Sequence, residues 1–165
     1  MDRSYNLLFL CTGNSARSIL AEALANQLGK SRFKAFSAGS HPRGRVHPVA
    51  LEVLNEAGIP TEDLRSKPWD EFATADAPAM DLIITVCDKA AGEACPVWPG
   101  HPVTAHWGIE DPASVVGSEE QIHKAFTKAL HLLQHRLSLL MALKIEALDR
   151  LVLETKVREI GTSST

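Results

Sequence analysis

The sequence has few cysteines, few aromatic residues and no long apolar run. Three cysteines and one tyrosine occur in 165 residues, and aromatic residues make up 5% of the chain. No segment approaches the roughly 18 consecutive apolar residues that a membrane-spanning helix needs. The N-terminal stretch MDRSYNLLFL has only a short apolar run, and no small-residue cleavage site follows it. These absences predict a cytoplasmic protein with no membrane partner, whose cysteines are thiols, metal ligands or redox catalysts rather than structural bridges.

The chain also lacks any run of lysine or arginine. Its formal net charge is -3 and its pI is about 6.1. Proteins bind the phosphate backbone of nucleic acids mainly through clustered lysine and arginine residues. Because this chain has no such cluster, a nucleic-acid partner is not expected. The length and a hydrophobic content of 45% suffice to bury one good core but not two, which predicts a single domain over residues 1–165.

Short apolar runs alternate with amphipathic stretches along most of the chain. This alternation predicts an α/β fold with a four-stranded parallel sheet and helices on both of its faces. We expect a core at about residues 5–142 and an additional C-terminal helix at about 144–160, because the helical pattern after residue 118 breaks near 142–145. The predicted strands are 5–10, 32–39, 81–87 and 103–107, and the earlier predicted helices are 17–29 and 46–58.

Residues 11–18 read CTGNSARS and directly follow the apolar run YNLLFL. Cys11 is therefore expected at the carboxyl end of a strand, where ligands of open α/β sheets bind, with a helix beginning shortly after it. Backbone N–H groups can point into one concavity there, and small side chains let the backbone wrap closely around a tetrahedral oxyanion. The residues of this predicted oxyanion-binding loop are Thr12, Gly13, Asn14, Ser15, Ala16, Arg17 and Ser18.

The same loop predicts a reactive thiolate. The loop N–H groups and the helix dipole stabilise negative charge, so we expect the pKa of Cys11 to lie well below that of a free cysteine. Arg17 adds a planar charged fork that suits two oxyanion oxygens, and Ser18 can cap the helix and donate its hydroxyl to the thiolate. The alternative is a buried apolar Cys11 and a surface Arg17; it is disfavoured because the strand, cysteine, small loop, arginine and serine all agree.

The pattern C-x5-R-S after a strand resembles the active-site loop of the low-molecular-weight tyrosine phosphatases. CTGNSARS is more similar to the arsenate reductases of the same fold, and the likeness covers roughly residues 5–113 in the expected order. The resemblance implies a doubly wound domain with a short parallel sheet and a loop cysteine that acts on a tetrahedral oxyanion, arsenate or phosphate. Besides the loop, the segments that carry the resemblance are AEA (21–23), FSAGS (36–40), DLIITVC (81–87), CPVWP (95–99) and HWGIEDPA (106–113).

Asp111 is the second candidate for catalysis. Pro112 disfavours helix at Asp111 and holds its carboxylate in an extended turn. In the families that the chain resembles, the aspartate of this Asp-Pro pair protonates the leaving oxygen as a general acid, which implies that role for Asp111. Glu110 is the competing carboxylate, one residue off the family pattern.

The remaining cysteines distinguish two reaction types. A phosphatase does not need Cys87 or Cys95, since water resolves its phosphocysteine, whereas a reductase needs two electrons. The resemblance implies that Cys11 attacks arsenate, Cys87 forms a disulfide with Cys11, and Cys95 moves the disulfide outward to an external dithiol. That dithiol is expected to be thioredoxin, with glutaredoxin or another thiol carrier left open because the 87–95 interval is about one residue longer than in well-known members.

Three other interpretations remain open at this stage. Cys95 can be an ordinary thiol in a phosphatase, although Ala113 follows Asp-Pro where tyrosine phosphatases usually place aromatic residues. A zinc site can be assembled from two cysteines and two histidines, but the spacing is not a familiar zinc pattern. We therefore expect no metal and no cofactor. A non-catalytic binding module is disfavoured because Cys11, Arg17 and Asp111 are all present. The four residues of the zinc alternative are Cys87, Cys95, His101 and His106.

Lys67 is a candidate support of the loop. Some relatives that resemble this chain at Asn14, Glu22 and Ser37 carry a carboxylate at the lysine position and bind potassium behind the loop. The resemblance implies that the Lys67 ammonium takes the place of this cation and pairs with Glu22. The alternative is a solvated surface lysine.

Overall fold

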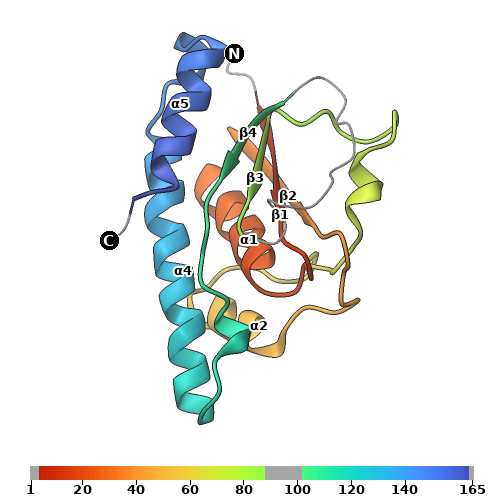
Figure 1. The fold of residues 1–165 in the computed structure, drawn as a ribbon, viewed down its shortest axis with the longest axis vertical. Coiled ribbons are helices and arrows are strands. Elements are labelled where there is room, and N and C mark those ends of the chain that lie inside the picture. The colour runs from red at the N-terminus through yellow and green to blue at the C-terminus, as the bar shows by residue number, and fades with distance from the viewer. Residues whose placement is uncertain (1–3, 88–101, 164–165) are drawn as a thin grey trace.

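The computed structural model describes residues 4–87 and 102–163. Its centre is a four-stranded sheet in which all neighbouring strands are parallel, in the order β2-β1-β3-β4 (Figure 1). The strands are β1 (Tyr5–Leu10), β2 (Phe33–Ala38), β3 (Leu82–Thr85) and β4 (Val103–His106). The predicted strands are confirmed in order and direction, and β2, β3 and β4 are one to three residues shorter than predicted.

Four α-helices and three 3₁₀ turns accompany the sheet in the described residues. The α-helices are α1 (Arg17–Gly29), α2 (Pro48–Glu56), α4 (Glu119–Met141) and α5 (Arg150–Ile160). The 3₁₀ turns are η1 (Trp69–Phe72), η2 (Pro112–Ser114) and η3 (Ile145–Ala147). The interruption between the last two helices is longer than predicted, and α5 begins at Arg150 rather than near 144. None of the helices in the described parts is long and apolar enough to cross a membrane.

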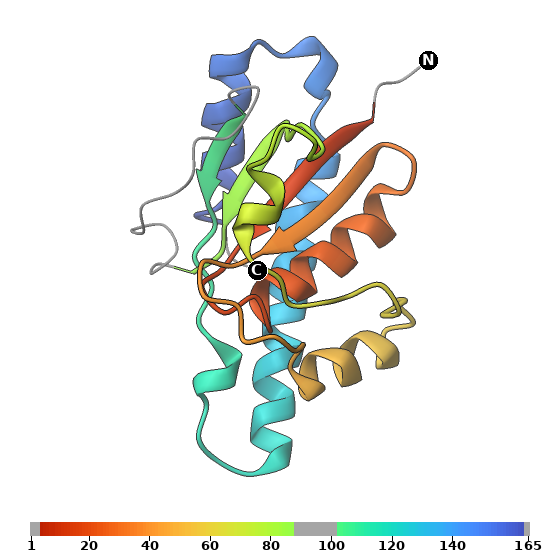
Figure 2. The ribbon, with the colours of Figure 1, turned by 90° about the vertical axis from the view of Figure 1, so that its right-hand side faces the viewer.

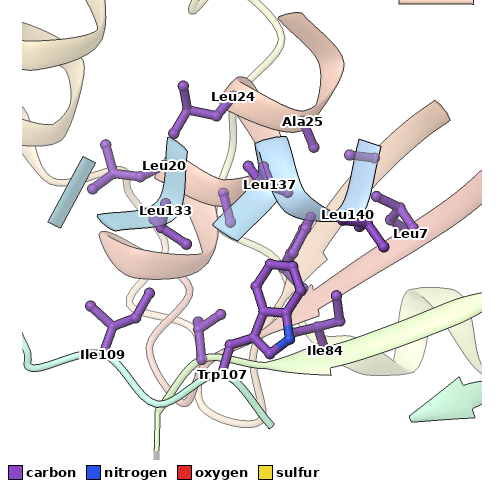
Figure 3. Packing of buried hydrophobic residues seen from close by; sticks show 14 of the residues in the cluster. Leu7, Leu20, Leu24, Ala25, Ile84, Trp107, Ile109, Leu133, Leu137 and Leu140 are labelled. Carbon is purple, nitrogen blue, oxygen red and sulfur yellow. The ribbon is translucent and has the colours of Figure 1, made fainter. Parts of the chain in front are cut away.

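The main core lies between one face of the sheet and the α-helices. Alternation along β1 sends Leu7 and Phe9 to this face, and α1 packs between the sheet and α4. Figure 3 shows Leu140 of α4 beside Leu7 of β1, with Leu137 and the ring of Trp107 in the same cluster. Trp107 is fully buried, and its indole Nε1 donates to the carbonyl of Val157 in α5 at 2.9 Å.

The opposite face of the sheet carries a smaller apolar cluster. Leu8 and Leu10, the alternate residues of β1, pack there with Trp69 and Phe72 of η1 and with Met80. Because β1 is buried on both faces, its sequence is a continuous apolar run rather than an alternating one.

Three of the described α-helices begin with side-chain caps, and in α5 the cap is Asp149, whose Oδ1 accepts the N–H of Val152 at 2.9 Å. His47 precedes Pro48, the first residue of α2, and its Nδ1 accepts the N–H of Val49 at 3.1 Å. Ser118 and Gln121 form a reciprocal capping box at the start of α4. These caps fix where α2 and α4 start, and α2 starts directly beside the loop that follows β1.

Candidate active site

Three chain segments meet where the strands end. Figure 2 shows the four strands pointing the same way, with the segments that follow them gathered at one edge. We call residues 11–18, which follow β1, the anion loop, and residues 107–114, which follow β4, the acid loop. Cys87 lies two residues after β3. Parallel strands bring these distant segments together, as expected for a ligand site of an open α/β sheet.

The segment after β2 holds the anion loop by donating backbone hydrogen bonds to its carbonyl groups. The N–H groups of His41, Arg43 and His47 each donate to a loop carbonyl at 2.9 Å, to Thr12, Gly13 and Ser15 in turn. Gly39 permits this approach, because a Cβ there would lie 2.5 Å from the carbonyl oxygens of Cys11 and Thr12. The N–H groups of Cys11 and Thr12 are bonded to the Ala38 carbonyl and to Cys87 Sγ, so it is the N–H groups after Thr12 in the loop that remain for an anion.

Asn14 connects the loop to the core. Its backbone has φ 41°, a left-handed conformation that asparagine tolerates. Its Nδ2 donates to the hydroxyls of Ser18 (2.8 Å) and Ser37 (2.9 Å), and its Oδ1 accepts the N–H of Lys67 (2.9 Å). The Ser37 hydroxyl in turn donates to Glu22 Oε1 at 2.6 Å. All of these groups are buried, so the network holds the loop in one conformation.

Lys67 forms the ion pair predicted for it. Its Nζ lies 3.5 Å from Glu22 Oε1 and donates to the carbonyl of Arg65 at 3.0 Å. Lys67 is only 5% exposed, so the alternative of a solvated surface lysine is wrong. Burial raises the pKa of Glu22 and lowers that of Lys67, and in each case the charge of the partner opposes the shift.

The two cysteines of the described chain form a buried pair. Cys87 Sγ accepts the N–H of Thr12 at 3.4 Å and lies 3.6 Å from the Thr12 hydroxyl. A side-chain hydrogen bond links Cys87 to Cys11, and this bond together with burial raises the pKa of Cys11. Arg17 and the N–H of Gly13 act in the opposite direction but do not outweigh them. The lowered pKa predicted for Cys11 is therefore wrong for this geometry.

Arg17 reaches across from the anion loop to the acid loop. Its Nη1 donates to the carbonyl of Ile109 at 2.8 Å, and its Nη2 lies 3.7 Å from Asp111 Oδ2. Its Nε is buried and has no hydrogen-bond partner among the described residues. A buried N–H of a cation without an acceptor is costly, which makes it a candidate donor to a bound oxyanion.

The space between the two loops is small. A cavity of about 30 Å³ is lined by Cys11, the loop residues from Gly13 to Arg17, Arg43, Asp111 and Ala113. Asp111 Oδ1 accepts the N–H of Ala113 at 3.0 Å, which holds the carboxylate in the extended turn expected before Pro112. Asp111 thus lines the cavity, whereas Glu110, the competing candidate, is exposed and does not.

One support of the acid loop, Arg136, was not predicted from the sequence. Arg136 of α4 is 6% exposed, and it donates to the carbonyls of Gly108 and Ser163, both at 3.1 Å. Burial lowers the pKa of Arg136. Its position among Leu133, Leu137 and Leu140 on the buried stripe of α4 was the available signal, because an arginine in such a stripe must find polar partners inside the fold.

Part of the predicted site cannot be located. Cys95 lies outside the described residues, as does His101, so the structure places neither the outer cysteine of the relay nor the alternative zinc site. Thr12, Ser15, Ala16 and Ser18 lie in the anion loop as predicted.

A thiol that faces an arginine and a carboxylate across a small cavity defines a class of enzyme that uses a cysteine nucleophile on a small oxyanion. The chain belongs to the low molecular weight phosphotyrosine protein phosphatase family, whose model matches residues 6–152. It is 38% identical to the arsenate reductase of Bacillus subtilis over 115 residues, which are 70% of this chain and 79% of that protein.

Two solved structures with the same fold are named for different activities. One is the thioredoxin-dependent arsenate reductase of Corynebacterium glutamicum, with 32% identity, a TM-score of 0.54, and coverage of 78% of this chain and 60% of that chain. The other is the low molecular weight protein tyrosine phosphatase of T. tengcongensis, with 26% identity, a TM-score of 0.68, and coverage of 88% of this chain and all of that chain. The predicted fold class is thereby confirmed.

Proposed function

We propose that this protein reduces arsenate to arsenite with Cys11 as nucleophile and with Cys87 and Cys95 as a disulfide relay. The observation that carries the proposal is the contact of Cys87 with the anion loop: its sulfur accepts the N–H of Thr12, the residue next to Cys11, at 3.4 Å, and its side chain is the main cause of the raised pKa of Cys11. A resolving thiol must reach the sulfur of the nucleophile, and Cys87 already lies against it. The similarity to the arsenate reductase of Bacillus subtilis supports the same activity.

The first step forms a bond between sulfur and arsenic. The loop N–H groups and Arg17 hold the oxyanion, and the Cys11 thiolate attacks arsenic(V). Asp111 protonates the departing oxygen, which leaves as water. The attacking thiolate is stabilised by Arg17 and by the N–H of Gly13, the two groups that act to lower the pKa of Cys11.

The second step transfers the electrons. The Cys87 thiolate attacks the sulfur of Cys11, the sulfur–arsenic bond breaks, and its electron pair stays on arsenic, which leaves as arsenite. A Cys11–Cys87 disulfide forms, so two thiols have supplied the two electrons. Cys95 then attacks Cys87 and frees Cys11, and an external dithiol reduces the Cys87–Cys95 disulfide. The similarity to a thioredoxin-dependent reductase favours thioredoxin over glutaredoxin as this dithiol.

Glu22, Ser37 and Lys67 are proposed as supports of the loop rather than reacting groups. They reach Asn14 through the buried hydrogen bonds and ion pair described above. In this arrangement the ammonium of Lys67 supplies the positive charge that a bound cation would otherwise bring to Glu22.

The alternative is hydrolysis of phosphate monoesters through a phosphocysteine. The name of the matching family and the similar phosphatase structure favour it. Cys87 argues for the reductase, because a water-resolved intermediate has no use for a second thiol hydrogen-bonded to the nucleophile. Ala113, a small residue, lines the cavity after Asp-Pro, where an aromatic side chain would be needed to clamp a substrate ring.

One preparation can be assayed for both reactions. NADPH consumption coupled through thioredoxin and thioredoxin reductase measures arsenate reduction, and phenol release from phenyl phosphate measures hydrolysis. We expect the first to be catalytic and the second to be much slower. Catalytic ester hydrolysis without arsenate-dependent NADPH consumption would establish the phosphatase instead.

The cysteine variants separate the steps of the relay. Cys95→Ala should release about one arsenite per enzyme and then stop with a Cys11–Cys87 disulfide, since that buried disulfide is poorly accessible to a protein reductant. Cys87→Ala should fail even the first turnover with thioredoxin. Undiminished multiple turnover by Cys95→Ala would remove Cys95 from the mechanism.

A further inference from the structure

A second cavity adjoins the anion loop. It encloses about 210 Å³ and is lined by Ser15, Arg43, Arg45, His47 and Pro48. Ser15 and Arg43 line both this cavity and the smaller one that contains Cys11. The two cavities are therefore adjacent, and Ser15 and Arg43 lie between them.

The charge around the second cavity is positive. The segment HPRGRVHP, residues 41–48, contains two arginines and two histidines but no carboxylate, in a chain whose net charge is -3. Neither Arg43 nor Arg45 forms an ion pair within the described ranges, whereas Arg65, Arg158 and Arg17 all lie near carboxylates. Two unpaired guanidinium groups in one cavity form a site that attracts anions.

His47 adds a neutral donor. Its Nδ1 accepts the N–H of Val49, so the hydrogen of the neutral ring is carried by Nε2. Burial lowers the pKa of His47, and the charges of Arg43 and Arg45 act in the same direction, while Asp111 opposes them. The ring is held against Phe126, with 4.7 Å between ring centroids.

The segment is fixed relative to the anion loop. The backbone N–H groups of Arg43 and His47 donate to the carbonyls of Gly13 and Ser15, as described above. The side chain of Arg43 packs over Gly13, where an added Cβ would lie 3.1 Å from Arg43 Nε. The backbone hydrogen bonds that hold the anion loop thus also fix the position of the segment that contains the two arginines.

We propose that Arg43, Arg45 and His47 form a second subsite, which binds a doubly charged tetrahedral oxyanion next to the one held in the anion loop. The inference deepens the proposed function, since the subsite would hold a second oxyanion beside the one that reacts at Cys11. It requires only that the anion loop binds an oxyanion, not that the protein reduces arsenate. A ligand with two linked phosphoryl groups should occupy both sites at once.

Binding of inorganic phosphate and pyrophosphate tests the subsite. Calorimetry at constant ionic strength on the reduced full chain measures both ligands, and protection of Cys11 from alkylation reports occupancy of the anion loop alone. We expect pyrophosphate to bind at least about tenfold more tightly than phosphate, because its second group binds at a high effective concentration. Arg45→Gln should remove most of this advantage and leave protection of Cys11 by phosphate within about twofold.

Arg158→Gln is the matched control. Arg158 is an exposed arginine on α5, paired with Glu154, and its loss changes the net charge by the same amount. The control should retain the pyrophosphate advantage. The subsite is overturned if pyrophosphate binds no more tightly than phosphate, or if the Arg45 and Arg158 variants weaken both ligands equally, since only net charge would then matter. If pyrophosphate binds more tightly than phosphate but the coupled assay shows no NADPH consumption with arsenate, the subsite is supported and the proposed function is wrong.

Discussion

The anion loop and the acid loop face each other across one cavity but are held by different parts of the chain. The anion loop is held by buried groups that all lie within the first 67 residues: Asn14, Ser18, Glu22, Ser37 and Lys67. The acid loop is held from behind by the C-terminal part, where Trp107 bonds to Val157 and Arg136 links Gly108 to Ser163.

This difference gives the two halves of the site largely different supports, and Arg17 joins them by donating to the carbonyl of Ile109. The family model ends at residue 152. All of the segments that hold Cys11 and the anion loop lie within it. The carboxylate half also depends on Val157 and Ser163, which lie beyond that limit. The C-terminal helix α5 therefore supports the acid loop through the side chain of Trp107, and Ser163, beyond α5, does so through Arg136, although neither supplies a residue of the cavity lining.

The largest effect should follow from Asp111→Asn. Loss of the general acid should lower kcat for arsenate about 10²- to 10⁴-fold. The asparagine oxygen can still accept the N–H of Ala113, so the acid loop keeps its turn and phosphate affinity should not fall. Coupled steady-state kinetics and phosphate calorimetry measure the two quantities. Glu110→Gln, which removes the same charge from an exposed neighbour, is the control, and equal losses in both variants would remove the acid role from Asp111.

Lys67→Met should be the largest perturbation of the anion loop. It leaves the Glu22 carboxylate buried without its ammonium partner, and unfolding free energy at pH 7.5 should fall by about 3 kcal/mol. Urea unfolding measures the change, with Lys128→Met on the exposed side of α4 as the control. The parent should gain no more stability from potassium than from sodium. A specific gain from potassium would contradict the proposed replacement of a cation by Lys67.

The pH dependence of the same variant has a definite sign. Burial raises the pKa of folded Glu22 above its unfolded value, and removal of Lys67 should raise it further. Between the unfolded and folded pKa values the folded chain binds more protons, so its stability falls as pH rises through this window. The loss of unfolding free energy in Lys67→Met, relative to the parent, should thus be smallest near pH 4.5 and grow towards pH 7.5. A deficit that is constant over this range would mean that Glu22 does not titrate with the pair.

The anion half of the site could be predicted from sequence because its information is local. CTGNSARS contains the nucleophile, the small loop residues and the arginine in eight consecutive positions, and the strand before it is marked by its apolar run. Asp111 was predictable for the same reason, since Pro112 beside it fixes the backbone. These residues lie where they were expected.

The support of the acid loop could not be predicted in the same way. Arg136 and its acceptors at Gly108 and Ser163 are separated by 28 and 27 positions, and Trp107 and Val157 by 50, with no local motif at either end. The pKa direction of Cys11 failed for a related reason. It depends on a hydrogen bond to Cys87, a contact created only when β1 and β3 pair in the sheet.

Arg136→Met tests whether the C-terminal support reaches the chemistry. The variant leaves the carbonyls of Gly108 and Ser163 without this donor, and unfolding free energy should fall by about 1–3 kcal/mol. If the support positions the acid loop, kcat for arsenate should also fall, by more than phosphate affinity does, and Arg136→Lys should restore part of both losses. Kinetics well below the melting temperature separate the two effects. A less stable variant with unchanged kcat would limit Arg136 to a structural role.

The smallest effect is expected for Arg65→Gln, which tests whether surface charge contributes to the support of the anion loop. Arg65 and Glu71 form a two-pronged ion pair at 2.7 and 3.0 Å, but the Arg65 side chain is 61% exposed. Exposed pairs contribute less than about 1 kcal/mol, and Arg65 also repels the nearby ammonium of Lys67, so its loss removes a favourable and an unfavourable contact together. Lys67 keeps the backbone carbonyl of residue 65 as acceptor in the variant. Urea unfolding should therefore change by less than about 0.5 kcal/mol, and phosphate protection of Cys11 should be unaltered. A loss approaching that of Lys67→Met would mean that the anion loop is held by the outer ion pair as much as by the buried one.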